Sequence, residues 1–168
     1  MLQPSLVVLE VVSAFQSIPA VITELGGNPS NIYGHNYYAG LENSLARTLY
    51  EQTAPSVIVA YKDLLGGNWD QSTRWKHRID IYLRPRNAAV DIGCLSPPDL
   101  FQLMFHSPLG APPSPLTGHW SAGIGIRYQS LYAGSMQLMD TPTMMHRQDE
   151  AGTDLFQISC VWPEYGDQ

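Results

Sequence analysis

The sequence is poor in charge and in cysteine. Charged residues make up 14% of its 168 residues, against a usual ~25%, and 9 Lys+Arg against 15 Asp+Glu give a formal net charge of −6. Free nucleic acid is therefore disfavoured as the main ligand, because binding phosphates needs clustered positive charge. Cys94 and Cys160 form no CxxC pair. They indicate neither a disulfide framework nor a zinc site and favour a reducing compartment, although a single bridge between them stays open.

Long apolar runs are also missing. Glu10 interrupts the apolar residues 1–12, which lack a basic start, and no run reaches the ~18 uncharged apolar residues of a membrane span. We therefore expect a soluble, unsecreted protein. The length predicts one domain, residues 1–168, and a hydrophobic content of 44% excludes a disordered chain. The 14 Gly and 13 Pro predict long ordered loops.

Familiar catalytic motifs do not occur. The sequence contains no GxSxG elbow, no phosphate-binding GxxxxGK[ST] loop and no GxGxxG after a strand. Its histidines lack HxxxH or HExxH spacing, so we expect no metal site and no cofactor. The acidic residues Asp149, Glu150 and Asp154 are typical of a solvated loop, and a hydrolase that uses Asp149 and Glu150 with a distant histidine is kept as an alternative. The histidines are His35, His77, His106, His119 and His146.

The N-terminal region carries an amphipathic helix pattern. Its apolar residues are spaced three and four apart, which puts them on one face. Pro19 removes a backbone donor inside this pattern and predicts a kink or break near Ser17. Residues 28–40, with three tyrosines, are expected to form a loop, and residues 41–52 a short helix or an extended arm. The apolar face consists of Val8, Val11, Phe15, Ile18, Ile22 and Leu25.

Two segments predict a β-hairpin. Residues 56–61 form a continuous β-branched run, which is typical of a strand buried on both faces. Residues 75–84 alternate between apolar and charged positions, which predicts a strand with one solvent-exposed face and His77 on the inward face. The connection over residues 62–73 is long for a hairpin and is expected to be a functional tip.

The remaining segments complete the expected fold. A helix should begin at Pro97 and end near Pro108, followed by a loop over residues 108–115. Three strands are expected at residues 121–128, 136–139 and 155–162, with a polar loop over residues 140–153. The order α-β-β-α-β-β-β predicts an α+β fold: one mixed, mainly antiparallel sheet with helices packed on one face. Residues 1–40 would add a helix and a tyrosine-rich loop to a sheet core of residues 41–168.

Five of the nine positive charges are concentrated in and just after the second hairpin strand. Two interpretations are open. The charges protect an edge strand from aggregation, or they dock an acidic partner or line a pore through which nucleic acid passes. We call this group the basic strip: Arg74, Lys76, Arg78, Arg84 and Arg86.

Three stretches together resemble the tail terminator (tail completion) proteins of long-tailed bacteriophages. They are PSVIVAY at residues 55–61, RWKHRIDIYLR at residues 74–84, and the final stretch from Met139, which runs through DTPTMMHRQDEAGTDLFQISCVWPE to Glu164. In that family a strand ending in VAY, a basic-aromatic strand and a final strand running into PE follow in this order. The resemblance spans residues 50–165, while residues 1–40 match nothing in the family closely.

The resemblance implies a structural role in the virion. Family members form a ring, usually six-fold, that caps the tail tube, stops its growth and docks the head connector. DNA would pass through the lumen without specific binding, and assembly would take place in the host cytoplasm. Arg78 and Arg84 would lie at a subunit contact or at the lumen. The hairpin tip and the 140–153 loop would face the tube or the connector, through Leu65, Asn68, Trp69, Met144, Met145 and Arg147.

Two further classes stay open beside the hydrolase. A head completion or connector protein of the virion neck would share the composition, the charge and the ring. A cellular adaptor module would not cap tube ends. A ring with a central hole separates the terminator interpretation from a monomeric or dimeric enzyme with a ligand-sized cleft.

Overall fold

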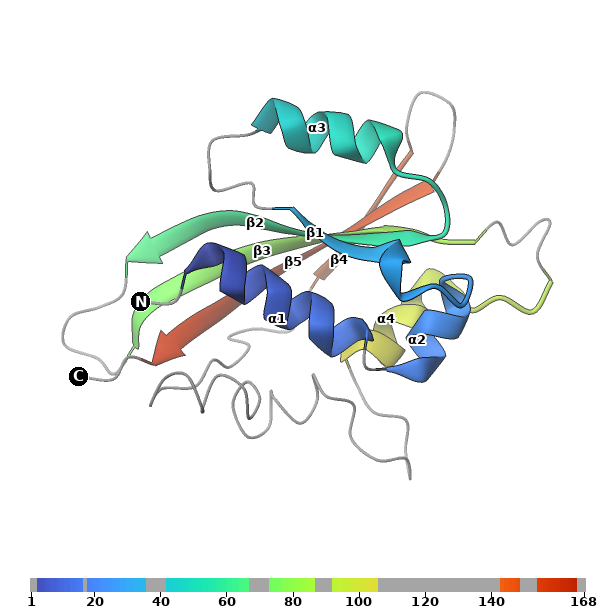
Figure 1. Cartoon of the computed structure of the whole chain (residues 1–168), viewed down its shortest axis with the longest axis horizontal. Coiled ribbons are helices and arrows are strands. Elements are labelled where there is room, and N and C mark those ends of the chain that lie inside the picture. Colours follow the sequence, from blue (N-terminus) through green and yellow to red (C-terminus); the bar gives the residue numbers. More distant parts are fainter. Residues whose placement is uncertain are drawn as a thin grey trace.

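The computed structural model describes residues 3–16, 18–35, 42–66, 73–86, 92–105, 143–148 and 154–165. The strands in these segments form one five-stranded sheet in the order β1-β2-β3-β5-β4 (Figure 1). β1 runs parallel to β2, and the other neighbouring pairs are antiparallel. The expected mixed, mainly antiparallel α+β sheet is confirmed. The strands are β1 (Ile32–His35), β2 (Ser56–Gly66), β3 (Thr73–Arg84), β4 (Thr143–Gln148) and β5 (Asp154–Tyr165).

Helices cover both faces of this sheet. In Figure 1, α1, α2 and α4 lie on one face of the sheet, and α3 is the only described helix on the other. The prediction that the helices pack on one face is therefore wrong for α3, which packs on Ile58, Ala60 and Tyr82 of the opposite face. Among the described helices, none is long and apolar enough to cross a membrane. The order of the described elements differs from the predicted α-β-β-α-β-β-β order, because β1 and α3 both precede the hairpin of β2 and β3. The helices are α1 (Pro4–Gln16), α2 (Pro19–Glu24), α3 (Glu42–Glu51) and α4 (Pro97–Phe105).

The predicted break in the N-terminal helix is present. α1 ends at Gln16, and α2 begins at Pro19 after Ile18, which has an extended backbone conformation. A proline at the first helical position loses no hydrogen bond, because that N–H has no partner within the helix. The break allows the apolar stripe to turn and follow the sheet, and α2 packs against both α1 and α4.

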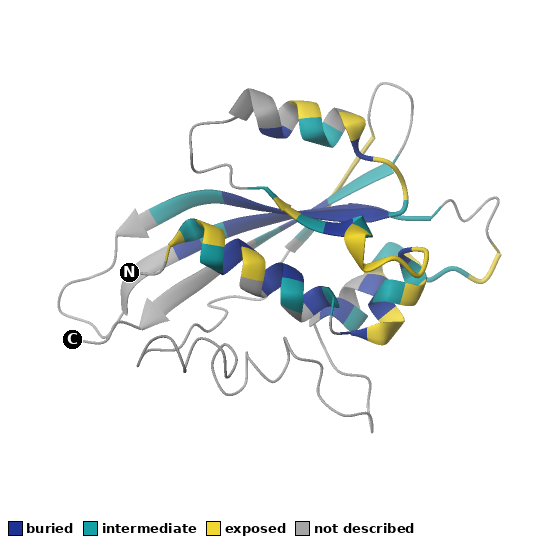
Figure 2. Ribbon diagram, viewed as in Figure 1, coloured by how far each residue is buried: buried dark blue, intermediate teal, exposed yellow. Residues whose placement is uncertain are grey.

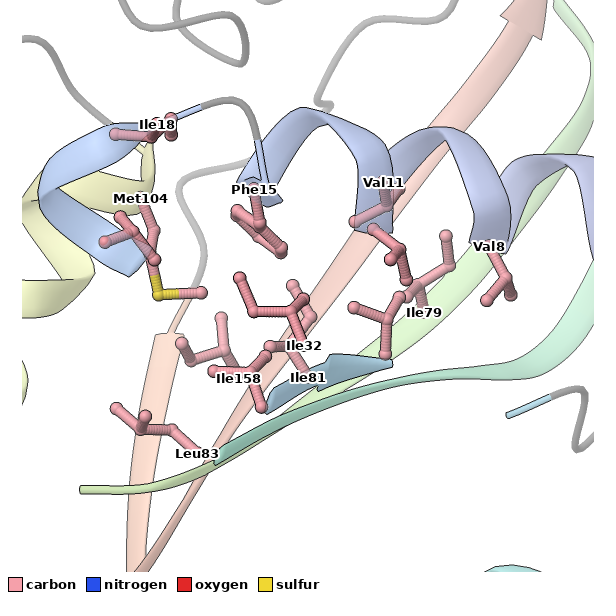
Figure 3. Packing of buried hydrophobic residues seen from close by; sticks show 14 of the residues in the cluster. Val8, Val11, Phe15, Ile18, Ile32, Ile79, Ile81, Leu83, Met104 and Ile158 are labelled. Atoms are coloured by element: carbon pink, nitrogen blue, oxygen red, sulfur yellow. The ribbon is translucent and has the colours of Figure 1, made fainter. Parts of the chain in front are cut away.

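The main hydrophobic core lies between α1, α2, α4 and the sheet (Figure 3). Phe15 is fully buried at its centre, and the β-branched side chains of β2, β3 and β5 meet it from the sheet. In Figure 2 the buried side of α1 faces the strands. This core contains the predicted apolar helix face, with Ile22 at its margin, and it explains why that spacing occurs in the sequence.

The opposite face is less apolar. α3 places Leu45 against Ile58, Ala60 and Tyr82, with Leu49 at the margin. The prediction that one face of residues 75–84 is exposed to solvent is therefore wrong for the end of β3. Asp80, Tyr82 and Arg84 on that face are buried. Amphipathic alternation identified the strand correctly, but it did not indicate that a second helix covers its polar side.

Two loop predictions also need correction. Residues 28–40 contain a 3₁₀ turn (Pro29–Asn31) and the short strand β1, whose Ile32 is buried in the main core. β1 is only four residues long and includes Gly34, so its strand propensity is weak and its pairing with β2 decides its structure. β2 does not end at residue 61, because its pairing with β3 continues to Gly66 past an irregularity between Tyr61 and Asp63.

Close packing favours glycine at position 34 of β1. A Cβ atom built on this glycine would overlap the Cγ1 methyl of Val8 on α1. The backbone of β1 therefore approaches α1 where any side chain would separate the two elements. The strands expected at residues 121–128 and 136–139 and the loop at 108–115 lie outside the described residues.

Candidate interaction surface

Arg78 of the basic strip is paired. It lies opposite Asp63 of β2 in the antiparallel register, and its Nη1 donates a hydrogen bond to Asp63 Oδ2 over 3.2 Å. The two side chains are 36% and 40% exposed. A pair this exposed contributes little stability. It nevertheless neutralises the positive charge that the sequence alone assigned to this position.

A second charge pair lies next to the first. Lys62 Nζ is 3.5 Å from Asp80 Oδ2, and Ser159 Oγ of β5 donates to Asp80 Oδ1 over 2.8 Å. The Asp80 side chain is only 3% exposed, while Lys62 is 39% exposed. A buried carboxylate needs such partners, because an unpaired one is strongly destabilising. The antiparallel pairing of β3 with β2 and β5 brings them together.

These two pairs form one surface feature on three adjacent strands. Two cations face two anions on the same side of the sheet as α3, so the feature is polar but balanced in charge. Sequence reasoning missed Lys62, Asp63 and Asp80. The signal was opposite charge at paired positions of a predicted hairpin. We call this feature the polar strip: Lys62, Asp63, Arg78, Asp80 and Ser159.

Arg84, which the resemblance implies at a subunit contact or at the lumen, is buried within this chain. Only 4% of the residue is exposed. Its guanidinium donates to the Leu49 carbonyl of α3 and the Asp154 carbonyl of β5, both over 3.4 Å. Sequence alternation placed Arg84 on a solvent-exposed face, but α3 covers that face and uses the arginine to hold its own C-terminal end on the sheet. A planar group with five donors suits this bridging role.

Arg86 also has a carboxylate partner. Its Nη2 donates to Glu24 Oε2 of α2 over 3.3 Å, and the backbone N–H of Leu95 donates to the same oxygen over 2.9 Å. Glu24 thereby links α2 to the residue segments that follow β3 and precede α4. This contact is consistent with a structural role for Arg86.

The edge-strand interpretation of the basic strip is wrong, because β3 is the central strand of the sheet. Arg74 and Lys76 lie on β3, and Leu65 lies near the end of β2. The side chains of these three residues are outside the described part of the structure. Asn68 and Trp69, the predicted tip residues, are also outside the described residues.

The second predicted docking segment is a strand and not a loop. Met144, Met145 and Arg147 belong to β4, which pairs antiparallel with β5. Met144 packs against the main core, whereas Met145 (40% exposed) and Arg147 are exposed. The polar composition of residues 140–153 hid the alternation of side chains, and pairing with the strongly apolar β5 decided the structure.

β4 also carries a histidine–aspartate contact. His146 Nε2 donates to Asp154 Oδ1 over 2.7 Å, and Gln148 donates to the same oxygen over 3.3 Å. The His146 ring stacks on Phe156, with ring centroids 4.6 Å apart. The hydrogen bond from His146 is the main reason that the pKa of Asp154 lies below its ordinary range. Both side chains are half-exposed, so this contact secures the start of the β4–β5 pair at the surface.

His77 is on the inward face of β3, as predicted. It is fully buried, and its Nδ1 and the Tyr61 hydroxyl are hydrogen-bonded over 2.7 Å. The two rings lie edge to face in the core. His77 is therefore a buried core histidine with a hydrogen-bond partner.

Within the described segments, no group of three or more His, Cys, Asp or Glu side chains is placed to hold a metal ion. Cys94 is a free thiol, so the bridge to Cys160 that the sequence left open is not formed. Asp149 and Glu150 of the hydrolase alternative lie outside the described residues.

The chain was compared with protein families, curated proteins and solved structures. No family model, no curated protein and no solved structure matches the chain.

Proposed function

We propose that this chain is a structural protein of a tailed bacteriophage, a tail terminator that forms a ring, caps the tail tube and stops its growth. The observation that carries the proposal is the position of the three stretches that resemble this family. Residues 55–61 cover the first half of β2, residues 74–84 cover nearly all of β3, and residues 139–164 cover β4 and nearly all of β5. These strands are neighbours in the sheet. A resemblance in sequence order thus corresponds to one continuous four-stranded surface.

The chemistry of that surface supports a packing role. The polar strip balances two cations against two anions, so a neighbouring subunit can cover it without a large uncompensated charge. Arg78 is exposed enough to take part in such a contact. A ring lumen built from a chain of net charge −6 would let DNA pass without holding it, since phosphate binding needs clustered cations.

The partners follow from this role. The chain would bind further copies of itself, the tail tube protein on one side and the head connector protein on the other. Its place would be the neck of the virion. A head completion or connector protein is the competing assignment, and the choice of tube or head as partner separates the two.

Negative-stain microscopy of the protein mixed with tail-tube protein from the same source tests the proposal. We expect tubes of limited length with a ring at one end. Arg47→Ala, which removes only an exposed ion pair within α3, is a control that should leave capping unchanged. Tubes that lengthen freely, with the protein unbound, would move the assignment to the head side of the neck.

A further inference from the structure

We propose that α3 opens from the sheet as one unit while the main core stays folded, because polar groups buried beneath it are left without partners. The inference goes beyond the proposed ring and does not depend on it. It assigns a conformational device to the face of the sheet that carries the polar strip. Proteins open locally in such cooperative units at a lower free energy than that of global unfolding.

The first observation is that α3 packs in a cluster of its own. Leu45 of α3 is buried against Ile58, Ala60 and Tyr82. Among the described residues of the main core, none comes from α3. Figure 1 shows α3 apart from the other described helices. The helix can therefore leave the sheet without opening the main core.

The second observation is that two buried amide oxygens lack hydrogen-bond partners. Gln52 directly follows α3 and is 7% exposed, Gln157 of β5 is 4% exposed, and the Oε1 atom of each has no partner. Gln157 lies opposite Tyr82 in the β3–β5 register, so it is on the side that α3 covers. A buried acceptor without a partner is destabilising, because it has lost its hydrogen bonds to water. Opening of α3 lets water reach these oxygens, which lowers the free energy of the open state relative to the closed state.

The third observation concerns the contacts at the C-terminal end of α3. Arg84 of β3 donates to the Leu49 carbonyl in the last turn of the helix. Directly after the helix, Gln52 donates to the Ser56 and Tyr82 carbonyls. Arg84 therefore holds the helix closed, while Gln52 fixes the chain on β2 and β3 at the point about which the helix lifts.

Opening changes the surface next to the polar strip. Ala60 lies opposite Asp80 of the strip in the β2–β3 register, and Tyr82 follows Asp80 on the same side of β3. Ala60 and Tyr82 are both buried in the closed state. The open state therefore adds an apolar centre to the polar strip, and the closed state hides it.

Thiol labelling tests the opening with a control on the same strand. Val59 and Ala60 are adjacent in β2 and both fully buried, but Val59 belongs to the main core and Ala60 packs under α3. Ala60→Cys and Val59→Cys variants are treated with iodoacetamide under native conditions. Peptide mass spectrometry locates the label, which allows Cys94 and Cys160 to remain. We expect labelling at position 60 to be roughly 100-fold faster than at position 59, and equal rates would overturn the proposal.

Native-state hydrogen exchange of the unsubstituted protein guards against a folding defect in either variant. We expect the α3 amides to share one opening free energy that is lower than that of the α1 amides. It should depend only weakly on urea, because the opening exposes little surface. If the amides of both helices exchange together through global unfolding, the proposal is wrong. Exchange of the α3 amides one by one, without dependence on urea, would indicate fraying of single residues and also contradict it.

Gln157→Leu tests the physical cause. The variant replaces a buried unpaired acceptor by an apolar side chain of similar size, which removes the gain from hydration in the open state. We expect exchange in α3 to slow by about tenfold, with exchange in α1 unchanged. Gln3→Leu, the same change at an exposed position before α1, should alter neither helix. Unchanged or faster exchange in α3 of the Gln157→Leu protein would show that the buried amides do not favour opening.

These measurements use the chain alone, without tail-tube protein. A failure of α3 to open therefore leaves the terminator assignment standing, and a failure to cap tubes leaves the opening of α3 standing.

Discussion

The two faces of the sheet are stabilised in different ways. One face is covered by α1, α2 and α4 over a continuous apolar core centred on Phe15. Of the described helices, only α3 covers the other face, over a small apolar cluster. On this second face buried polar groups complete the packing: Arg84 bridges α3 to β5, and Gln52 donates to the Ser56 and Tyr82 carbonyls. The first face depends on buried area, whereas the second depends on specific hydrogen bonds.

This difference has a consequence for function. An apolar face that three helices cover has no room for a partner. Among the described elements only α3 covers the second face, and the polar strip is partly exposed. We therefore expect substitutions on the first face to act on stability and substitutions on the polar strip to act on assembly.

The largest effect should follow from Phe15→Ala. Removing a fully buried ring leaves a cavity in the main core, and we expect a loss of about 3–5 kcal/mol in the free energy of unfolding. Urea denaturation followed by circular dichroism measures it. Leu9→Ala, on the exposed side of the same helix, should change the value by no more than about 0.5 kcal/mol. Equal losses in the two variants would show that α1 is not packed as described.

Arg84→Met should have the next largest effect and should act on the opposite face. It retains much of the apolar stem but removes the charged donors to Leu49 and Asp154, so we expect a loss of roughly 1.5–3 kcal/mol. Hydrogen exchange should accelerate in α3 more than in α1. The matched control is Arg47→Met on the surface of α3, which breaks only an exposed i,i+4 pair and should cost about 0.5 kcal/mol or less. Uniform acceleration in both helices would contradict the separate anchoring of α3.

Gly34→Ala should destabilise the α1–β1 contact by about 1–2 kcal/mol, because the added methyl overlaps Val8. A double-mutant cycle with Val8→Ala measures the coupling by urea denaturation. We expect the penalty of Gly34→Ala to shrink when Val8 is shortened. If the two changes are additive, the close approach of β1 to α1 does not limit the residue at position 34.

The smallest effect should be the pH-dependent contribution of Asp154. The hydrogen bond from His146 holds the folded-state pKa of Asp154 below its ordinary value of 3.8. The ionised side chain therefore stabilises the fold above that value, and the contribution is lost as pH falls through the lowered pKa. Stability measured between pH 7 and pH 2 should show a difference between the parent protein and Asp154→Asn that disappears in acid. If the stability difference between the two proteins is the same at every pH, ionisation of Asp154 does not cause it.

The sequence predicts much of the face that carries the main core. The spacing of Val8, Val11 and Phe15 predicted the helix face that is buried, and Pro19 predicted the break between α1 and α2. The alternation of residues 75–84 predicted β3 and the inward position of His77. These features follow from local periodicity and from the backbone chemistry of proline, which do not depend on distant parts of the chain.

The sequence did not predict the face that α3 covers in the same way. Arg84 and Tyr82 have the alternation of exposed residues and are nevertheless buried, because α3 covers them from a distant position in the sequence. The same limitation applies to β1 and β4, whose short segments have weak strand propensity and become strands by pairing with apolar neighbours.

The sequence by itself determined the α+β class, the hairpin of β2 and β3, and the apolar side of the N-terminal helices, because each is encoded in the spacing of nearby residues. Tertiary structure alone decided which charges are paired, which arginine is buried and in which order the described strands pair. Those properties depend on contacts between residues far apart in the chain, such as Asp80 with Ser159 or Arg84 with Asp154. Local periodicity contains no information about such contacts.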